Sequence, residues 1–365
     1  MKILHVYKDF DPPVHGGIEG HIARLCRYQQ QWGEVDVLTC SRSILTRSVI
    51  HGGTRVTEVG EWGRFQRAPI APAFPWHLRR SDADVVVLHL PNPTAEVAWL
   101  LAPSGAALVI RYHSDVVRQA RAMKVYGPLQ QRLLKKAARI LPTSQVYLDS
   151  STTLAPHQAR CRVVPLGIEA AAFQSPDEEA VAALHERYGS RFVLFSGMHR
   201  YYKGLKHLVA AAGAIDAPVV IAGEGPERSA LMAQAASLGV EIHFPGYLAH
   251  HELVAHLHAA SVFVFPSVAR SEAFGISIME AHAAGLPVVA TRLGTGVEFI
   301  NEDGKTGLNV APGDDQALAE AVNRILGDPE AALSMGAYAR DRIERDFDAC
   351  SLAAAEWTHY EEALA

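Results

Sequence analysis

The sequence lacks the features expected of a disulfide-linked, zinc-bound or membrane-spanning protein. Its four cysteines are scattered and form no CxxC pair. Isolated cysteines are typical of free thiols in a reducing cytoplasm. No apolar run approaches the roughly 18 residues that a spanning helix needs, and the first residues, MKILHVY, resemble a strand more than a signal peptide. We therefore expect a globular cytoplasmic protein.

The length and the charge distribution both indicate two parts. A chain of 365 residues with 49% hydrophobic and 20% charged residues is long enough for two domains. Residues 1–165 carry 21 Lys/Arg against 12 Asp/Glu, whereas residues 166–365 carry 13 against 27. A basic half can attract an anionic membrane or a phosphorylated acceptor, or simply the acidic half. No nucleic-acid-binding module accompanies the basic residues, so we expect no nucleic-acid partner.

Strand-like and helix-like segments alternate along both halves. Strands rich in Val, Ile and Leu that alternate with helices predict an α/β fold of parallel sheets covered on both faces. The first half has such strands at 2–7, 34–39, 84–89, 107–113, 138–141 and 162–165; the second has them at 191–196, 218–223, 240–244, 261–266, 286–291 and 306–310. We predict two doubly wound domains, 1–168 and 169–349, facing each other across a ligand-binding crevice at the carboxyl ends of the strands. A helix at 350–365 could pack back on the first domain.

The segment SEAFGISIMEAHAAGLPVVAT (271–291) contains the strongest local signal for chemistry. It follows a predicted strand and enters a helix near Gly275. Backbone N–H groups at a helix N-terminus are unpaired donors and suit a diphosphate. Glu272 precedes the helix and Glu280 lies about one and a half turns inside it, so both could hold sugar hydroxyls. Taken alone, the segment is better explained by an acid at a helix start, favoured by the helix dipole, and a solvated glutamate.

This segment resembles the Glu-x7-Glu motif of the retaining family-4 glycosyltransferases, which have the GT-B fold of two Rossmann-like domains. Glu272 and Glu280 match it with seven residues between them. Further segments resemble the family in order along nearly the whole chain: GGIEGHIARL (16–25), VVPLGIE (163–169), SGMHRYYKGLKHL (196–208), AGEGPERSAL (222–231), FPGYL (244–248) and RLGTGVEFI (292–300). Several ordered matches are much more specific than any one of them.

The resemblance implies a role for each matching residue. Glu280 would bind ribose hydroxyls, and Glu272 would lie beside the transferred sugar. Lys203 would neutralise the diphosphate leaving group, on which negative charge grows as the glycosidic bond breaks. The amides of Phe274, Gly275 and Ile276 would meet the distal phosphate and the sugar, and Tyr247 lies in the segment that faces the nucleotide base.

Four further residues follow the resemblance less directly. The family usually has arginine at position 198, where this chain has Met198, and Arg200 could reach the phosphates instead. Gly16 and Gly17 follow the first strand, where the absence of Cβ allows close backbone approach to donor or acceptor, or simply a tight turn. His113 ends a predicted strand and resembles the family's active-site histidine near the donor sugar.

No metal site is expected. Asp82 and Asp84 form an Asp-x-Asp sequence, but they precede a strand and so belong to the amino edge of the sheet, away from the crevice. The resemblance likewise implies transfer without an obligatory metal or other cofactor.

Two segments of the basic half favour a membrane interface or a lipid-diphosphate acceptor. Residues 61–80 mix aromatic residues with arginines, and residues 118–139 contain seven cations in two predicted helices broken at Gly127-Pro128. Cations next to aromatic residues suit the headgroup region of an anionic membrane. Each segment alone could equally be a solvated surface. Together they predict peripheral contact with the inner face of the cell membrane.

The sequence therefore predicts a retaining hexosyltransferase that uses a nucleoside diphosphate sugar and a glycan or lipid-linked acceptor. The RYYKG and LGTG forms resemble members that handle mannose or rhamnose in surface polysaccharide assembly, which favours GDP-mannose as donor. A UDP-hexose is the alternative donor. A non-catalytic GT-B-like protein that binds glycans is a different class of function, which loss of Glu272 or Lys203 would have favoured. A nucleotide-sugar epimerase of similar shape fits the Glu-x7-Glu pattern poorly.

Overall fold

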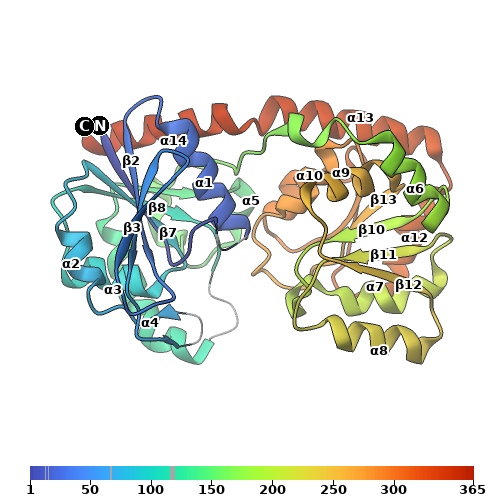
Figure 1. Ribbon diagram of the computed structural model, residues 1–365, viewed down its shortest axis with the longest axis horizontal. Helices are drawn as coiled ribbons and strands as arrows, with labels where there is room; N and C mark the ends of the chain where they lie inside the picture. Colours follow the sequence, from blue (N-terminus) through green and yellow to red (C-terminus); the bar gives the residue numbers. More distant parts are fainter. Residues whose placement is uncertain (13, 15, 66–67, 116–119) are drawn as a thin grey trace. The chain divides into compact units, whose positions relative to one another are not determined.

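Two large sheets, whose strands are parallel except for one hairpin and which are covered by helices, organise the chain in a computed structural model (Figure 1). The structure describes residues 1–12, 14, 16–65, 68–115 and 120–365, and for 120–125 the backbone alone. Unit 1 consists of Met1–Gly167 and Ala349–Ala365, and unit 2 of Ile168–Asp348. Each unit is therefore described by itself.

Unit 1 has a seven-stranded sheet of order β3-β4-β2-β1-β7-β8-β9. Its strands are β1 (Lys2–Val6), β2 (Glu34–Cys40), β3 (Arg47–His51), β4 (Thr54–Val59), β7 (Val85–Leu90), β8 (Ala107–Tyr112) and β9 (Arg139–Pro142). The hairpin β3–β4 is antiparallel and forms one edge, and the other pairs are parallel. The helices are α1 (Gly17–Gln29), α2 (Phe74–Arg79), α3 (Pro93–Leu101), α4 (Ala120–Lys136), α5 (Gln145–Ser150) and α14 (Ala349–Leu364), with a small hairpin of β5 (Arg64–Phe65) and β6 (Ala68–Pro69).

The last helix belongs to the core of unit 1. Helix α14 contacts α1 and strands β7, β8 and β9, and Figure 1 shows it beside α1. Trp357 and Tyr360 of α14 are buried in one cluster with Ile3, Val87 and Val109 of the sheet. Burial of two aromatic rings is a large apolar gain, so this packing holds the end of the chain on unit 1.

Unit 2 has a six-stranded, all-parallel sheet of order β12-β11-β10-β13-β14-β15. Its strands are β10 (Val193–Ser196), β11 (Val219–Ala222), β12 (Ile242–Gly246), β13 (Val262–Phe265), β14 (Val288–Thr291) and β15 (Gly307–Val310). Its helices are α6 (Glu178–Tyr188), α7 (Leu205–Ala211), α8 (Arg228–Leu238), α9 (His250–Ala259), α10 (Ile276–Ala283), α11 (Gly296–Ile300), α12 (Asp315–Leu326) and α13 (Pro329–Asp346). Residues of β11, β13, β14 and β15 are buried on both faces, as expected when helices cover a sheet on each side, whereas the edge strand β12 is mostly half-buried.

Two expectations about local structure are wrong. Residues 162–165 form no strand, although Arg162 and Val164 donate their amides to Ile140 and Pro142 beside β9. The carbonyls of Val164 and Pro165 instead accept hydrogen bonds from the guanidinium of Arg111. Helix α4 also continues through Gly127 and Pro128, since a proline removes one hydrogen bond without always ending a helix.

Candidate functional site

The order of the strands in unit 2 locates a ligand-binding point. The chain moves outward from β10 to β11 and β12, then returns to place β13 on the other side of β10. Loops that follow β10 and β13 therefore leave the carboxyl edge side by side, with their helices on opposite faces. In doubly wound sheets this switch point is where ligands bind. The loop that ends at Lys203 follows β10, and the loop that contains Glu272 follows β13.

A close backbone approach fixes these two loops against each other. Gly204 has φ +64°, and a Cβ on it would lie 2.0 Å from the carbonyl oxygen of Pro266. Only glycine fits that conformation and that spacing without displacement of the backbone. The Val268 amide also donates to the Tyr202 carbonyl at 2.8 Å. Lys203, between Tyr202 and Gly204, therefore starts from a well-defined backbone position.

Lys203 and Glu272 meet in an ion pair at this point. The Lys203 Nζ lies 2.6 Å from the Glu272 Oε2, and each side chain is 12% exposed. The Ser267 hydroxyl donates to the same carboxylate oxygen at 3.3 Å, and the Lys203 Nζ lies 4.5 Å from the centre of the Phe265 ring. The pair thus has an apolar wall on one side and water on another. A cation held in this way can exchange one anionic partner for another.

Backbone amides at the start of α10 lie in the same loop. The N-cap of α10 is Gly275, with φ +97°, and no side chain caps the helix. Phe274 is buried, which holds the peptide that leads into the helix. The amides of the first turn can therefore bind an anion. Glu280 lies further along α10 and is half-buried.

The loop after β14 supports this helix start. The Gly296 amide donates to the Ala273 carbonyl at 2.8 Å, and the Arg270 Nη1 donates to the Gly294 carbonyl at 2.8 Å. Glu298 accepts from the amides of Gly294 and Thr295 at 2.6 and 3.2 Å. The sequence reasoning did not single out Arg270 or Glu298. The Thr-x-x-Glu spacing of a helix capping box could have identified Glu298.

Two expected donor-binding residues, Arg200 in the loop after β10 and Tyr247 after β12, point elsewhere or lie further along the edge. The Arg200 Nε is 2.7 Å from the Met198 sulfur, so the side chain is turned toward the residue that replaces the family's arginine. Tyr247 follows the edge strand β12 and is 70% exposed. Among the described residues, no hydrogen bond or ion pair joins the side chain of Arg200 or Tyr247 to Lys203 or Glu272.

The residues expected to act in unit 1 occupy the carboxyl edge of its sheet. Gly16 is the N-cap of α1, in an extended conformation that any residue adopts, and Gly17 is the first residue of that helix. A Cβ on Gly16 would lie 2.3 Å from a Glu19 carboxylate oxygen, the end of a flexible side chain that can move aside, so neither the space nor the backbone conformation requires glycine there. His113 directly follows β8, and its amide donates to the Leu90 carbonyl at 3.1 Å.

His113 is buried and neutral. Its side chain is 3% exposed, and its Nε2 lies 2.9 Å from the His89 Nδ1. Burial, helped by the positive charge of Arg111, holds the pKa of His113 well below its usual value. A neutral imidazole can donate through one nitrogen and accept through the other.

The Asp82 and Asp84 carboxylates lie at the amino edge of the unit 1 sheet. Asp82 pairs with the Lys2 Nζ at 2.8 Å, and Asp84 accepts from the Lys2 amide at 2.7 Å. These contacts fix the start of β1 beside that of β7. In the described part of the chain, no group of three or more His, Cys, Asp and Glu is arranged to hold a metal ion.

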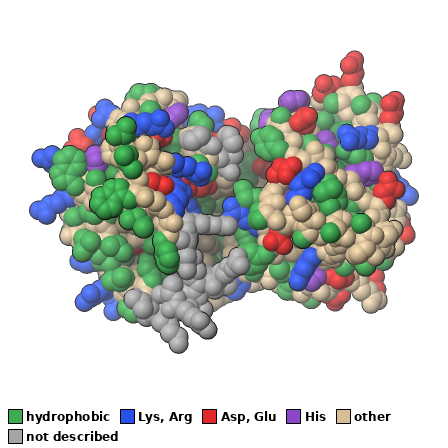
Figure 2. All heavy atoms as spheres, turned by 60° about the horizontal axis from the view of Figure 1, so that its bottom comes forward, with side chains coloured by type: hydrophobic (Ala, Val, Ile, Leu, Met, Phe, Trp, Pro, Cys, Tyr) green, Lys and Arg blue, Asp and Glu red, His purple; other side chains and the backbone are tan. Residues whose placement is uncertain are grey.

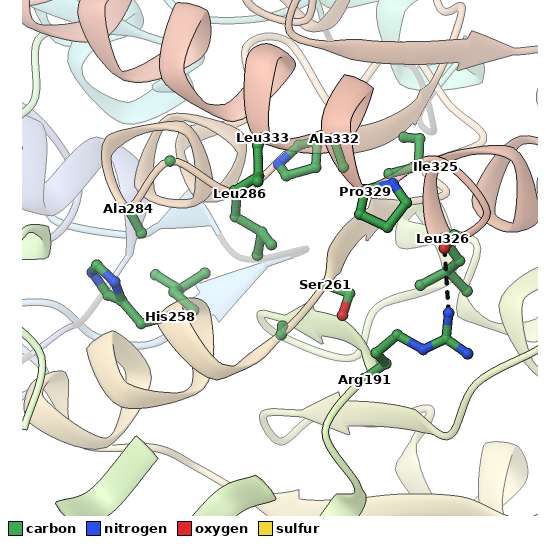
Figure 3. A pocket seen from close by; sticks show the side chains of 14 residues that line it. Arg191, His258, Ser261, Ala284, Leu286, Ile325, Leu326, Pro329, Ala332 and Leu333 are labelled. Atoms are coloured by element: carbon green, nitrogen blue, oxygen red, sulfur yellow. Dashed lines mark hydrogen bonds between the residues drawn. The ribbon is translucent and has the colours of Figure 1, made fainter. Parts of the chain in front are cut away.

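A pocket of about 390 Å³ in unit 2 lies away from the switch point. Figure 3 shows apolar side chains around it and the bond from Arg191 to the Leu326 carbonyl. Arg191 and Ser261 precede β10 and β13, so the pocket belongs to the amino edge of the sheet. None of the expected donor-binding residues lines it. Because ligands bind at the carboxyl edge of doubly wound sheets, we place the candidate site at the switch point and not in this pocket.

Comparison with known proteins assigns the chain to a family. Residues 15–172 match the family described as Glycosyltransferase Family 4, and residues 177–342 match Glycosyl transferases group 1. The chain is 36% identical over 357 residues to D-rhamnosyltransferase WbpZ of Pseudomonas aeruginosa, covering 96% of this chain and 93% of that protein. It is also 36% identical over 353 residues to O-antigen chain mannosyltransferase C of Escherichia coli, covering 96% and 95%.

Solved structures show the same fold at lower identity. Sucrose-phosphate synthase of Thermosynechococcus elongatus has a TM-score of 0.83 at 23% identity, covering 99% of this chain and 98% of that one. WaaG, a glycosyltransferase involved in lipopolysaccharide biosynthesis, has a TM-score of 0.74 at 18% identity, covering 97% and 98%. The chain thus has the GT-B fold and belongs to the family-4 type of glycosyltransferases.

Proposed function

We propose that this protein is a retaining glycosyltransferase that moves mannose from GDP-mannose to a hydroxyl of a glycan or lipid-linked acceptor. The observation that carries the proposal is the Lys203–Glu272 pair beside the uncapped start of α10. Two relatives that span nearly the whole chain are named for transfer of rhamnose and mannose. Their names favour a mannose-type sugar, and the GDP base rests on the resemblance of residues 200–204 and 293–296.

In the proposed reaction, the bond between the anomeric carbon and the diphosphate oxygen breaks, and the acceptor oxygen bonds to the same face of the sugar. The diphosphate leaves with the bonding electrons, and its departing oxygen takes the proton of the acceptor hydroxyl. Lys203 and the amides of Phe274, Gly275 and Ile276 stabilise its charge, with Arg200 as a further cation. These groups replace a metal ion, which the proposed reaction does not require.

The remaining residues hold the parts of the donor that do not react. Glu280 binds the ribose hydroxyls, Tyr247 faces the base, and Glu272 and His113 contact the transferred sugar. Gly16 and Gly17 allow the backbone of unit 1 to approach the donor or the acceptor.

The ion pair has a consequence for donor binding. Lys203 is already neutralised by Glu272, so the diphosphate competes with a carboxylate for the cation. Once the phosphate takes Lys203, the Glu272 carboxylate is free to accept hydrogen bonds from the sugar. Donor binding therefore prepares Glu272 for its own role.

A panel of thermal shifts with GDP, GDP-mannose, UDP and UDP-glucose tests the donor. A ligand that binds only the folded protein raises its stability by about 2.7 kcal/mol at a hundredfold excess over Kd. We expect the guanine ligands to give the larger shift. A larger shift with UDP ligands would support the UDP-hexose alternative. Binding without transfer to any acceptor would support a non-catalytic glycan-binding protein, and the anomeric configuration of the product, determined by NMR, tests retention.

We also propose that unit 1 contacts an anionic membrane from the cytoplasmic side. No helix in the described part of the chain is long and apolar enough to span a bilayer. Figure 2 shows hydrophobic and basic side chains gathered on the face of unit 1 that it presents. Helix α3 packs between α2 and α4 and also contacts β6. Exposed apolar side chains are Trp76 of α2 and Leu101 of α3, at 53% and 73%, and Trp62, two residues before β5, at 76%.

The structure changes which residues can serve this contact. Phe74 is fully buried, and Arg64 is paired with Asp9 and Glu61, so neither is available as expected. Arg132, Lys135 and Lys136 of α4 are exposed. Arg118 and the side chains of Arg121 and Lys124 lie outside the described residues. Exposed indole rings next to cations are typical of side chains that insert at a headgroup interface.

A further inference from the structure

A row of hydrogen-bonded rings crosses the interior of unit 1 to His113. The Gln29 Oε1 lies 2.9 Å from the His5 Nε2, and the His5 Nδ1 lies 3.0 Å from the His89 Nε2. The His89 Nδ1 lies 2.9 Å from the His113 Nε2. His5 is in β1, His89 in β7 and His113 directly after β8, which are neighbouring strands of the sheet. All four side chains are at most 3% exposed.

The amide oxygen of Gln29 gives this row one direction. An amide oxygen can only accept, so the His5 Nε2 carries a proton. A neutral His5 then has a lone pair on Nδ1, so His89 donates to it through Nε2. His89 in turn has its lone pair on Nδ1, and His113 donates through Nε2. His113 is therefore left with a lone pair on Nδ1.

This nitrogen has no hydrogen-bond partner within the described chain, although it is buried. A buried polar atom without a partner costs free energy, so such an atom at the carboxyl edge of a sheet points to a ligand group that completes it.

Neutrality, on which the direction depends, follows from burial. Burial lowers the pKa of His5 and takes the pKa values of His89 and His113 well below their usual range. The nearby positive charge of Arg111 lowers the latter two further. His21 also faces the row, with ring contacts to His89 and His113, and burial lowers its own pKa to about 4. The rings are therefore uncharged at neutral pH.

Helix α14 places an ion pair and a hydroxyl beside the row. The Tyr360 hydroxyl donates to the Glu356 Oε2 at 2.8 Å, and the Glu356 Oε1 pairs with the Arg111 Nε at 2.9 Å. Burial and the Glu356 charge raise the pKa of Tyr360, whereas the Gln29 amide lowers it. These groups close the row on the side of helix α14, where the Tyr360 ring lies 6.2 Å from the His5 ring.

We propose that Gln29, His5 and His89 are positioning residues that fix His113 as the neutral Nε2–H tautomer, so that its Nδ1 accepts a hydrogen bond from a ligand hydroxyl. The direction originates at the Gln29 amide oxygen and reaches His113 through His5 and His89. The tautomer is a property of the free protein. Acceptance of a sugar hydroxyl rests on the proposed function.

The tautomer can be read directly by long-range 1H–15N NMR of protein labelled with 15N at histidine. His113 signals are assigned by their loss in His113→Phe. We expect wild-type His113 to be protonated at Nε2 alone between pH 6 and 8. A wild-type His113 that is protonated at Nδ1, or at both nitrogens, would overturn the proposal whatever ligand the protein binds.

One substitution tests the row itself. Gln29→Met removes the acceptor at the start of the row and should give a mixture of His113 tautomers. Gln30→Met is the matched control, because it removes the bond from the neighbouring glutamine to Thr54 and leaves the row intact. A single Nε2–H tautomer that persists in a folded Gln29→Met protein would refute the positioning role.

The ligand step has a separate readout. If Gln29→Met makes both tautomers equally populated, the competent fraction halves and the apparent Kd of the donor rises about twofold. The KM for the donor should rise in the same proportion while kcat changes less. If wild-type His113 is the Nε2–H tautomer but the protein binds no nucleotide, the proposed function is refuted and the positioning role is not. A tautomer mixture with an unchanged donor KM would refute acceptance by Nδ1.

Discussion

The two units place different chemistry at the same edge of the same kind of sheet. In unit 2 the loops after β10 and β13 hold a charged pair, Lys203 and Glu272, that water still reaches. In unit 1 the corresponding edge holds His113, at the end of a row of buried, uncharged rings. A charge near water is stable alone and can bind a phosphate. A buried group must instead be neutral or fully paired, and its use lies in a fixed hydrogen-bond direction.

The largest expected effect is on the free energy of unfolding, which should fall much more when a buried ion pair is broken than when an exposed one is. Arg111 and Glu356 are both fully buried, and Arg111 also donates to three backbone carbonyls. Arg111→Met leaves a buried carboxylate unpaired and should lower the free energy of unfolding by about 3–5 kcal/mol. Arg139→Met is the control, since it breaks a partly exposed pair with Glu362, which lies on α14 as Glu356 does, and should cost at most about 1 kcal/mol. Urea unfolding measures both, and similar losses would contradict the distinction.

Acid should weaken unit 1 before unit 2. Burial lowers the pKa of His21 to about 4 from 6.5, so the unfolded chain binds more protons between these values. Its stabilising contribution is complete above about pH 6.5 and is lost toward pH 4, by about 3 kcal/mol. His5, His89 and His113 act in the same direction. Among the described residues of unit 2, His199 and His282 are fully buried, and burial lowers the pKa of both, that of His282 to about 3.

Limited proteolysis at pH 7 and pH 5, with the fragments identified by mass spectrometry, distinguishes the units. We expect the first cuts at pH 5 to fall within unit 1. First cuts within unit 2 would mean that the histidines of unit 1 are less protected from water than their burial indicates.

Substitutions at the charged pair should mainly affect the donor. Lys203→Ala removes a charged hydrogen bond to the diphosphate, for which about 1.5–3 kcal/mol, or roughly 10- to 150-fold in Kd, is typical. Glu280→Ala should weaken nucleotide binding through lost ribose contacts, whereas Glu272→Ala should lower turnover more than affinity. Lys206→Ala, on the exposed face of α7, is the control. Calorimetric titration with the nucleotide measures affinity, and an unchanged Kd in Lys203→Ala would remove this lysine from the site.

The smallest expected effect per substituted residue is the loss of binding to an anionic membrane. Each Lys or Arg near an anionic surface contributes about 1 kcal/mol, over a distance of about 8 Å at physiological ionic strength. Replacement of Arg132, Lys135 and Lys136 by glutamate should release the protein from anionic vesicles and leave nucleotide binding intact. Co-sedimentation at low and high salt measures this. Wild-type protein that stays in the supernatant at low salt would refute the membrane proposal.

The alternation of strands and helices could be read from the sequence because it is local. Runs of Val, Ile and Leu identify buried parallel strands, and most lie within one or two residues of the expected positions. The hairpin β3–β4 was missed because its exposed edge strand has no such run. The segment 162–165 was mistaken for a strand because Arg111, distant in the chain, binds its carbonyls.

For the candidate site, the sequence alone determined which residues follow the carboxyl ends of strands, because that depends on neighbours in the chain. It therefore placed Lys203 after β10 and Glu272 and Gly275 after β13. Only the tertiary structure decided that β10 and β13 are adjacent, and so that Lys203 and Glu272 pair. It also decided that α14 packs on unit 1 and that positions 5, 29, 89, 113, 356 and 360 share one interior. Strand order and helix docking bring these positions together, and no local pattern encodes either.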